Sequence, residues 1–273
     1  MKTIGSTIIM LALVPSLFAD NSKELKLASP DGTHEIAFYQ KQVSPAVNEL
    51  CYRVDYKSQP VVNESRAGLE LDNRIWEMAL GARNLKQPAC WMDNLEVDSV
   101  TYQPETDITW QPLYGERSSV RDHYRTGTLY LSKKDNSGYR LNIEVRAYNE
   151  GVAFRYFFPE HPKAIFHKVV GDLTEYTLPA GTKAWTEQWA QAFFKYLSID
   201  DIKHPVERAL TLELPNGKWA ALADADIDDW CLTKYLASTD KKNTLTSVMY
   251  SPVDVVTYYA TPWKIVMAAD KPG

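Results

Sequence analysis

The stretch YRLNIEVRAYNEGVAFRYFF, residues 139–158, decides the fold. Its first half alternates, because Leu141, Ile143, Val145 and Ala147 are separated by polar or charged residues. Period-two alternation is typical of a β-strand with one face in the core. Gly151 then precedes a second run of apolar and aromatic residues, 152–158, which predicts another strand.

The same pattern recurs outward from this stretch in both directions. Short alternating or apolar runs predict strands at 25–27, 34–40, 50–56, 128–132, 210–214, 218–222, 253–259 and 263–268. Turn residues separate them, such as Pro30-Asp31-Gly32 and Pro215-Asn216-Gly217, where Gly tolerates the positive φ of a tight turn. Helical periodicity is scarce, with one or two short turns expected in 187–202 and another in 224–229. The sequence therefore predicts an all-β protein, a large antiparallel β-sandwich in one domain over residues 20–273.

The first nineteen residues have the composition of a secretory signal peptide. Lys2 supplies a positive start, residues 4–18 are mostly apolar, and Ala19 is suited to cleavage. The run is shorter than the roughly 20 residues that a membrane-spanning helix needs. We therefore expect export to the periplasm, and no later segment is apolar enough to span a membrane.

Charge and cysteine content exclude some classes of function. The net charge is −5 and no basic stripe is present, so nucleic acid is not an expected partner. Cys51, Cys90 and Cys231 are too scattered for a zinc or redox motif, and both free thiols and one disulfide remain open. The 8 Trp, 16 Tyr and 8 Phe suit either strand packing or stacking on sugar rings.

No self-contained catalytic motif is present in the sequence. The five histidines are dispersed, and no pair has metal-ligand spacing. Asp224, Asp226, Asp228 and Asp229 form an acidic cluster that a hard cation would suit, although a solvated loop is the interpretation we favour.

The segment WQPLYGERSSVRDHY, residues 110–124, mixes aromatic residues, both signs of charge and a Pro-Gly turn. It predicts a loop with a fixed, hydrogen-bonded path. Here the sequence resembles the N-terminal domain of glycoside hydrolase family 97, which includes α-glucosidases and α-galactosidases of gut Bacteroidetes. The string W-x-P-x-x-G-E-x-x-x-x-R-x-H-Y is the most recognisable signature of that family.

Four further motifs match in the family's order. They are LASPDG at 27–32, RAYNEGVAFRY at 146–156, the stretch 216–230, and TPWK at 261–264, which is similar to a TPWR motif before the catalytic domain. The resemblance covers residues 25–270. It implies a β-supersandwich like that of galactose mutarotase, packed on a (β/α)8 barrel that is expected after residue 270.

In the family, the barrel carries the catalytic carboxylates, which act by inversion or retention. The resemblance therefore implies a chain without catalytic residues, inactive alone, that shapes the cleft of the barrel of an α-glucosidase or α-galactosidase. Two other hypotheses are a stand-alone carbohydrate-binding module, or split-gene fragment, and a mutarotase-like epimerase that uses His and Glu.

The resemblance also implies a calcium ligand in this domain. Calcium-dependent members supply a glutamate about eleven residues before an Ile that corresponds here to Ile202. That position holds Gln191, and Glu187 lies one helical turn earlier. An amide oxygen lacks the charge of a carboxylate, so calcium is expected in the full-length enzyme and not in this chain alone.

Candidate substrate-binding residues are Trp185, Trp189 and His123. Packing against the barrel is the alternative role for both tryptophans, and with Phe193 and Phe194 they are expected to form an exposed apolar patch. Hydrogen bonds that hold strand ends are the alternative role for His123, as they are for Arg121, Asn149 and Arg155.

Overall fold

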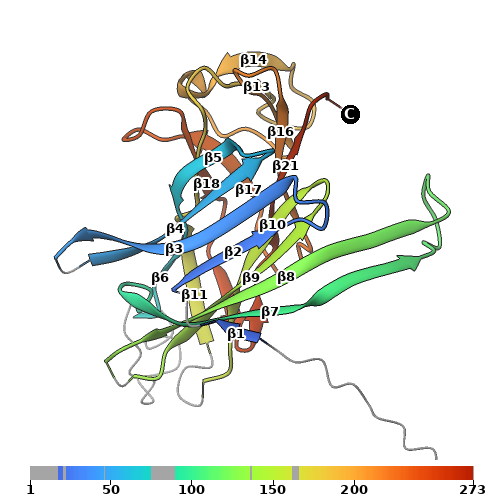
Figure 1. Cartoon of the computed structure of the whole chain (residues 1–273). Helices are drawn as coiled ribbons and strands as arrows, with labels where there is room; N and C mark the ends of the chain where they lie inside the picture. Colours follow the sequence, from blue (N-terminus) through green and yellow to red (C-terminus); the bar gives the residue numbers. More distant parts are fainter. Residues whose placement is uncertain are drawn as a thin grey trace, which may run out of the picture.

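The computed structural model describes residues 18–20, 23–45, 47–74, 90–135, 137–161 and 166–272, which form an almost entirely β structure (Figure 1). The helical element whose bounds lie within these ranges is η1 (Ile199–Asp201), a single 3-10 turn. The predicted signal peptide lies outside the described residues except for Phe18 and Ala19, which begin strand β1. No described helix has the length and apolar character that crossing a membrane requires.

The largest sheet has eleven antiparallel strands. In spatial order they are β1 (Phe18–Asp20), β7 (Leu95–Trp110), β8 (Val120–Lys133), β9 (Arg140–Tyr148), β10 (Gly151–Phe158), β21 (Trp263–Ala269), β16 (Trp219–Ala225), β15 (Leu210–Glu213), β13 (Lys183–Thr186) and β14 (Lys195–Ser198), with β20 (Tyr259–Ala260) paired to β10.

A second sheet has seven antiparallel strands: β17 (Thr233–Ala237), β18 (Thr244–Met249), β12 (Glu175–Thr177), β5 (Gln59–Arg66), β4 (Val47–Tyr56), β3 (His34–Ser44) and β2 (Glu24–Ala28). A small third sheet consists of β19 (Val253–Val256), β11 (Phe166–Asp172) and β6 (Leu69–Leu71).

The hairpin that the opening stretch predicts is β9–β10. Tyr148 pairs with Gly151, and Val145 pairs with Phe154 farther along the two strands. The four alternating apolar residues of β9 are all buried, as are Val152, Phe154, Tyr156 and Phe158 of β10. The predicted strand pair and its core-facing side are therefore confirmed.

The core lies between the eleven- and seven-stranded sheets. Phe154 of β10 packs edge-on against Phe38 of β3 and at a tilt against Tyr52 of β4, with ring centroids 5.0 Å apart in both cases. His34 of β3 is buried, and its Nε2 lies 3.0 Å from the Ala268 carbonyl oxygen of β21. Aromatic packing and a buried polar contact thus join the two layers of the predicted sandwich.

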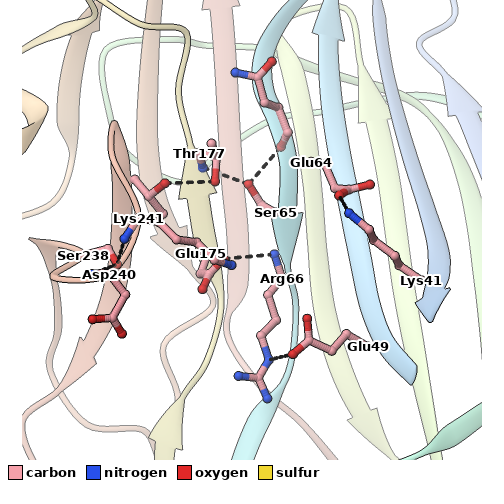
Figure 2. A network of polar contacts seen from close by, with 12 residues as sticks. Lys41, Glu49, Glu64, Ser65, Arg66, Glu175, Thr177, Ser238, Asp240 and Lys241 are labelled. Carbon is pink, nitrogen blue, oxygen red and sulfur yellow. Dashed lines mark hydrogen bonds and ion pairs between the residues drawn. The ribbon is translucent and has the colours of Figure 1, made fainter. Parts of the chain in front are cut away.

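Polar side chains strengthen the seven-stranded sheet where its ladder is weakest (Figure 2). β12 pairs with β5 through a single residue pair, Thr177 with Asn63. Beside it the Thr177 amide donates to Ser65 Oγ (2.8 Å), and Glu175 accepts from Lys241 Nζ (2.6 Å) and from the Arg66 amide (3.4 Å). These bonds offset the short ladder.

The structure has one short helical turn in 187–202, η1, as expected, and it corrects two other local expectations. Residues 224–229 hold no helical turn, because Asp224 and Ala225 extend β16 by pairing with Lys264 and Trp263 of β21. Asp226 then takes a positive φ of 58° that ends the strand. The segment 110–124 is also only partly a loop, since its ends belong to β7 and β8.

All three cysteines are free thiols. Cys51 is buried in β4, and this burial raises the pKa of its thiol to about 11. Cys90 and Cys231 are half-buried. Of the two alternatives left open by the sequence, the structure therefore has free thiols.

We expect Gly151→Ala to destabilise the domain, because an added Cβ would lie 2.5 Å from the Val266 carbonyl oxygen and 2.8 Å from the Met267 Cα. Both atoms are backbone atoms of the neighbouring strand and cannot rotate away. Overpacking of this kind costs about 1–3 kcal/mol. Urea denaturation should show this loss, whereas Gly68→Ala should change stability far less because its Cβ would approach only Leu173, at 4.0 Å. Equal losses in the two variants would contradict the packing argument.

Candidate functional site

The candidate site is built on the loop of residues 187–194, which joins β13 to β14. Thr186 pairs with Lys195 at the base of the loop, and its Oγ1 donates to the Lys195 carbonyl oxygen at 3.1 Å. Within the loop the Ala192 amide donates to the Trp189 carbonyl oxygen at 2.8 Å. The loop therefore has a defined path although it carries no regular secondary structure.

Between this loop and the segment 201–206 lies a hollow of 540 Å³. The loop contributes Glu187, Trp189, Gln191 and Phe193 to its lining, and Asp201 and His204 come from the opposite wall. An aromatic surface beside carboxylate, amide and imidazole groups can pack against a sugar ring and hydrogen-bond to its hydroxyls.

The four aromatic residues expected to form an apolar patch are all exposed. Trp185, Trp189, Phe193 and Phe194 have 43%, 58%, 91% and 67% of their surface accessible, which confirms the expected exposure. They do not form one group, however, because only Trp189 and Phe193 line the hollow.

Trp185 instead belongs to a separate aromatic pair on β13 and β14. Its ring lies 4.7 Å from that of Tyr196, the residue opposite it in the ladder. The Tyr196 hydroxyl donates to Glu213 Oε2 at 2.5 Å, and this hydrogen bond raises the pKa of the tyrosine. Trp185 and Trp189 are therefore neighbours in sequence with different surroundings.

Glu187 and Gln191, the two residues considered as calcium ligands, both line the hollow. Calcium takes six to eight oxygen ligands, several of them charged. Among the described residues no three His, Cys, Asp or Glu side chains are gathered as a metal site. The hollow's lining holds two carboxylates, Glu187 and Asp201.

His123 lies elsewhere, on β8. Six strand-to-strand steps separate β8 from β13 in the sheet order, which corresponds to about 29 Å along the sheet. The Nε2 atom of His123 lies 2.6 Å from Glu105 Oε1 on β7. The structure therefore does not bring His123 together with Trp189.

The other signature residues are hydrogen-bonded within the domain. Arg121 makes a bidentate pair with Asp107, with both distances 2.7 Å. Asn149 Oδ1 accepts from the Asp31 amide at 3.0 Å. Arg155 pairs with Glu144 at 2.7 Å, as expected of residues that hold strands and turns in place.

The acidic cluster is dispersed. Asp224 is nearly buried, accepting from Thr233 Oγ1 at 2.5 Å and pairing with Arg208 at 3.4 Å. Asp226 pairs with Arg155 at 3.3 Å, whereas Asp228 and Asp229 are exposed. Only Asp224 lies in β16, so the four carboxylates do not line one strand.

One residue that matters for the site was not identified from the sequence. Lys234 of β17 is buried, and its Nζ donates to the Gln188 carbonyl oxygen and to Glu207 Oε1, at 2.6 Å each. Burial is the largest single influence on the pKa of this lysine and lowers it, but the hydrogen bond to Glu207, the charge of Glu207 and the nearby Tyr250 together raise the pKa above its usual value. A lysine within a strand was visible in the sequence, but its partners, 27 and 46 positions away, were not.

Lys234 is one of two ties that hold the start of the loop. The other is the Glu207 amide, which donates to the Glu187 carbonyl oxygen at 2.9 Å. Because Glu207 also accepts from Lys234, the two ties share one residue. The Lys234 ammonium therefore binds both the loop, at the Gln188 carbonyl, and Glu207, the residue whose amide holds Glu187.

We expect Lys234→Met to loosen the loop, because it removes the ammonium and leaves the Gln188 carbonyl and the Glu207 carboxylate without this partner. Hydrogen bonds to charged groups contribute about 1.5–3 kcal/mol, which corresponds to roughly 10–100-fold faster local amide exchange. Hydrogen-exchange mass spectrometry of the segments that contain Ala192 and Glu207 measures it.

Two variants make the test specific. Lys234→Arg keeps the charge and should restore most of the protection. Lys264→Met removes another buried lysine, paired with Asp172 in the core, and should weaken the whole sandwich without singling out this loop. Uniform acceleration along the chain in Lys234→Met would show that the residue only stabilises the fold.

A protein-family model, a related protein and several solved structures match this chain. The family model described as glycosyl-hydrolase 97 N-terminal matches residues 27–273. A retaining alpha-galactosidase of Bacteroides thetaiotaomicron is 24% identical in an alignment of 263 residues that covers 90% of this chain and 35% of that protein.

Solved structures share the fold. A glycoside hydrolase family 97 enzyme from Pseudoalteromonas sp. strain K8, solved in complex with acarbose, superimposes with a TM-score of 0.77 at 20% identity, over 90% of this chain and 36% of that one. A beta-arabinopyranosidase gives 0.71 at 17% identity, over 90% and 40%. The chain thus spans little more than a third of the length of these relatives.

Proposed function

Because the chain belongs to the glycosyl-hydrolase 97 N-terminal family, we propose that it serves as the N-terminal domain of an enzyme that hydrolyses α-glucosides or α-galactosides. In this proposal the hollow beside loop 187–194 forms one wall of the substrate cleft, and a (β/α)8 barrel forms the other. The observation that carries it is the placement of Trp189 and Phe193, both exposed, at a hollow that also holds Glu187, Gln191 and His204.

The chemistry of the hollow supports an oligosaccharide as the ligand. An exposed indole face packs on the apolar face of a sugar ring, and the flanking polar groups accept or donate hydrogen bonds to its hydroxyls. Family members have been solved with panose and with acarbose, and the Bacteroides relative is named a retaining alpha-galactosidase.

In this proposal the N-terminal domain and the barrel have different roles in hydrolysis. Trp189 and Phe193 bind and orient the sugar and exclude water from one side of the cleft, whereas the barrel supplies the two carboxylates of glycoside hydrolysis. Export to the periplasm is part of the same proposal. It is supported by the positively charged start and apolar run of residues 1–19.

We expect the purified chain to leave p-nitrophenyl α-glucoside and α-galactoside unhydrolysed, and the polypeptide that joins it to a barrel to hydrolyse one of them. In that longer polypeptide Trp189→Ala should raise KM about two- to tenfold, the usual worth of one aromatic contact. Phe194→Ala is the matched control, since Phe194 is an exposed aromatic residue of the same loop that does not line the hollow. Turnover by the chain alone, or equal effects of the two substitutions, would count against the proposal.

Calcium gives a second test. We expect the isolated chain to bind calcium with a dissociation constant weaker than about 1 mM, because the hollow offers too few charged oxygens. Titration calorimetry measures it. Micromolar binding that Glu187→Gln abolishes would show that this chain builds the site itself, and loss through Asp226→Asn would place the ion at the acidic loop.

A further inference from the structure

The β7–β8 hairpin extends far beyond the body of the domain (Figure 1). We call residues 103–126 the arm. Its first strand segment, 103–110, is about 26 Å long at 3.3 Å per residue. Most of its side chains are exposed, and Leu113 and Tyr114 at the tip have 99% and 90% of their surface accessible.

The two faces of the arm differ in chemistry. On one face Asp107 pairs with Arg121, and Glu105 pairs with both His123 and Arg125, at 2.6–2.8 Å. These charges satisfy one another on the arm itself. This face is therefore suited to water.

The opposite face is largely apolar. Directly opposed residues in a ladder share a face, and Trp110 opposes Val120 while Thr106 opposes Tyr124. Ile108 and its ladder partner Asp122 lie between these pairs, so the face carries one carboxylate among its apolar side chains. Of the surface of Ile108 and of Trp110, 55% and 49% are accessible. The arm is thus amphipathic, yet no described segment covers its apolar face.

This apolar face continues into the outer face of the eleven-stranded sheet. The Tyr124 ring lies 5.0 Å from that of Tyr148 and 4.6 Å from the Arg146 guanidinium, which in turn lies 4.7 Å from the ring of Trp263. Arg146, Tyr148 and Trp263 line a hollow of 370 Å³ together with Ala153, Ala225, Ile265 and Met267. The arm's apolar face and this outer face therefore form one arm-and-sheet surface.

An exposed apolar surface of this size is expected to be buried against another folded segment or protein. A two-stranded hairpin without a core is marginally stable in water, and a large contiguous apolar patch is a liability for a soluble monomer. A surface that runs from the tip of the arm across β9, β10, β21 and β16 matches a folded body better than a peptide. The matched relatives hold about 60–65% of their length outside the matched part, which is enough chain for such a body.

We infer that the catalytic domain docks on the arm-and-sheet surface and packs against the apolar face of the arm. The inference rests on the proposed function, because the occupant is its barrel. It adds a docking surface that begins at the arm, about 29 Å along the sheet from the hollow at loop 187–194, and extends across the sheet toward that hollow. Ile108, Trp110 and Tyr124 make the contact, and the ion pairs of the opposite face stay in water.

The test compares this chain with the polypeptide that joins it to the barrel. Amide exchange in 103–110 and 120–126 should slow at least tenfold in the longer polypeptide. Trp110→Ser should lower the Tm of the longer polypeptide by several degrees and leave that of the isolated chain unchanged. Thr109→Ala, on the charged face of the same strand, should change neither.

Equal exchange of the arm in the two proteins would overturn the inference. So would protection of the arm in a dimer of the isolated chain, which would make a second copy the occupant, or protection by a malto-oligosaccharide alone. A longer polypeptide that lacks hydrolytic activity but still protects the arm would refute the proposed function and leave the docking surface standing.

Discussion

The packing of the eleven-stranded sheet on the seven-stranded sheet is the constraint on which the rest of the structure depends. Along each central strand every second side chain is committed to that core, so its neighbours must face outward. Phe154 lies in the core against Phe38 and Tyr52, and this placement turns Ala153 and Arg155 to the outer face. A shift of one residue would exchange the two faces, so burial of the core also determines the functional surface.

The outer face is unusual for a face without a cover. In β16 the outward positions are Trp219, Ala221, Ala223 and Ala225, and in β21 they begin with Trp263, whose ring has the Arg146 and Arg155 guanidinium groups at 4.7 and 4.4 Å. Solvated strand faces are normally polar. Here the Arg146 and Arg155 guanidinium groups lie over the Trp263 ring, and Arg155 pairs with Glu144 on the same face. Aromatic residues and arginines are enriched in the same way at protein interfaces.

Local pattern predicted the elements that depend on neighbours in sequence. The hairpin at 139–158 follows from alternation, and the β15–β16 hairpin follows from Asn216-Gly217, where Gly217 has the expected positive φ of 78°. The signature motifs predicted the fold class by resemblance. The charged face of the arm could not be predicted from local sequence, because Glu105 and His123 are 18 positions apart and come into contact only when β7 pairs with β8.

The site was predictable only where its residues lie in one segment. Glu187, Trp189, Gln191 and Phe193 belong to one loop, so the sequence placed them together, and the structure adds the hollow beside them. It also separates Trp185, because β13 alternation turns that side chain to the outer face while buried Thr186 points inward. The role of Lys234 depends on tertiary contacts with Gln188 and Glu207, and the periodicity of the sequence does not predict such contacts.

The two surfaces of this domain lie on the same sheet, and this relates docking to the cleft. The arm rises from β7 and β8 near one end of the sheet, and loop 187–194 joins β13 and β14 at the other. A body seated between them on the outer face would contact the arm on one side and reach the loop on the other. Trp185 and Tyr196, on the outer face of the strands that carry the loop, lie where that body would meet the rim of the hollow. If the proposed docking holds, four aromatic residues of this segment would divide by strand geometry, with Trp185 and Tyr196 facing the docked domain and Trp189 and Phe193 facing the sugar.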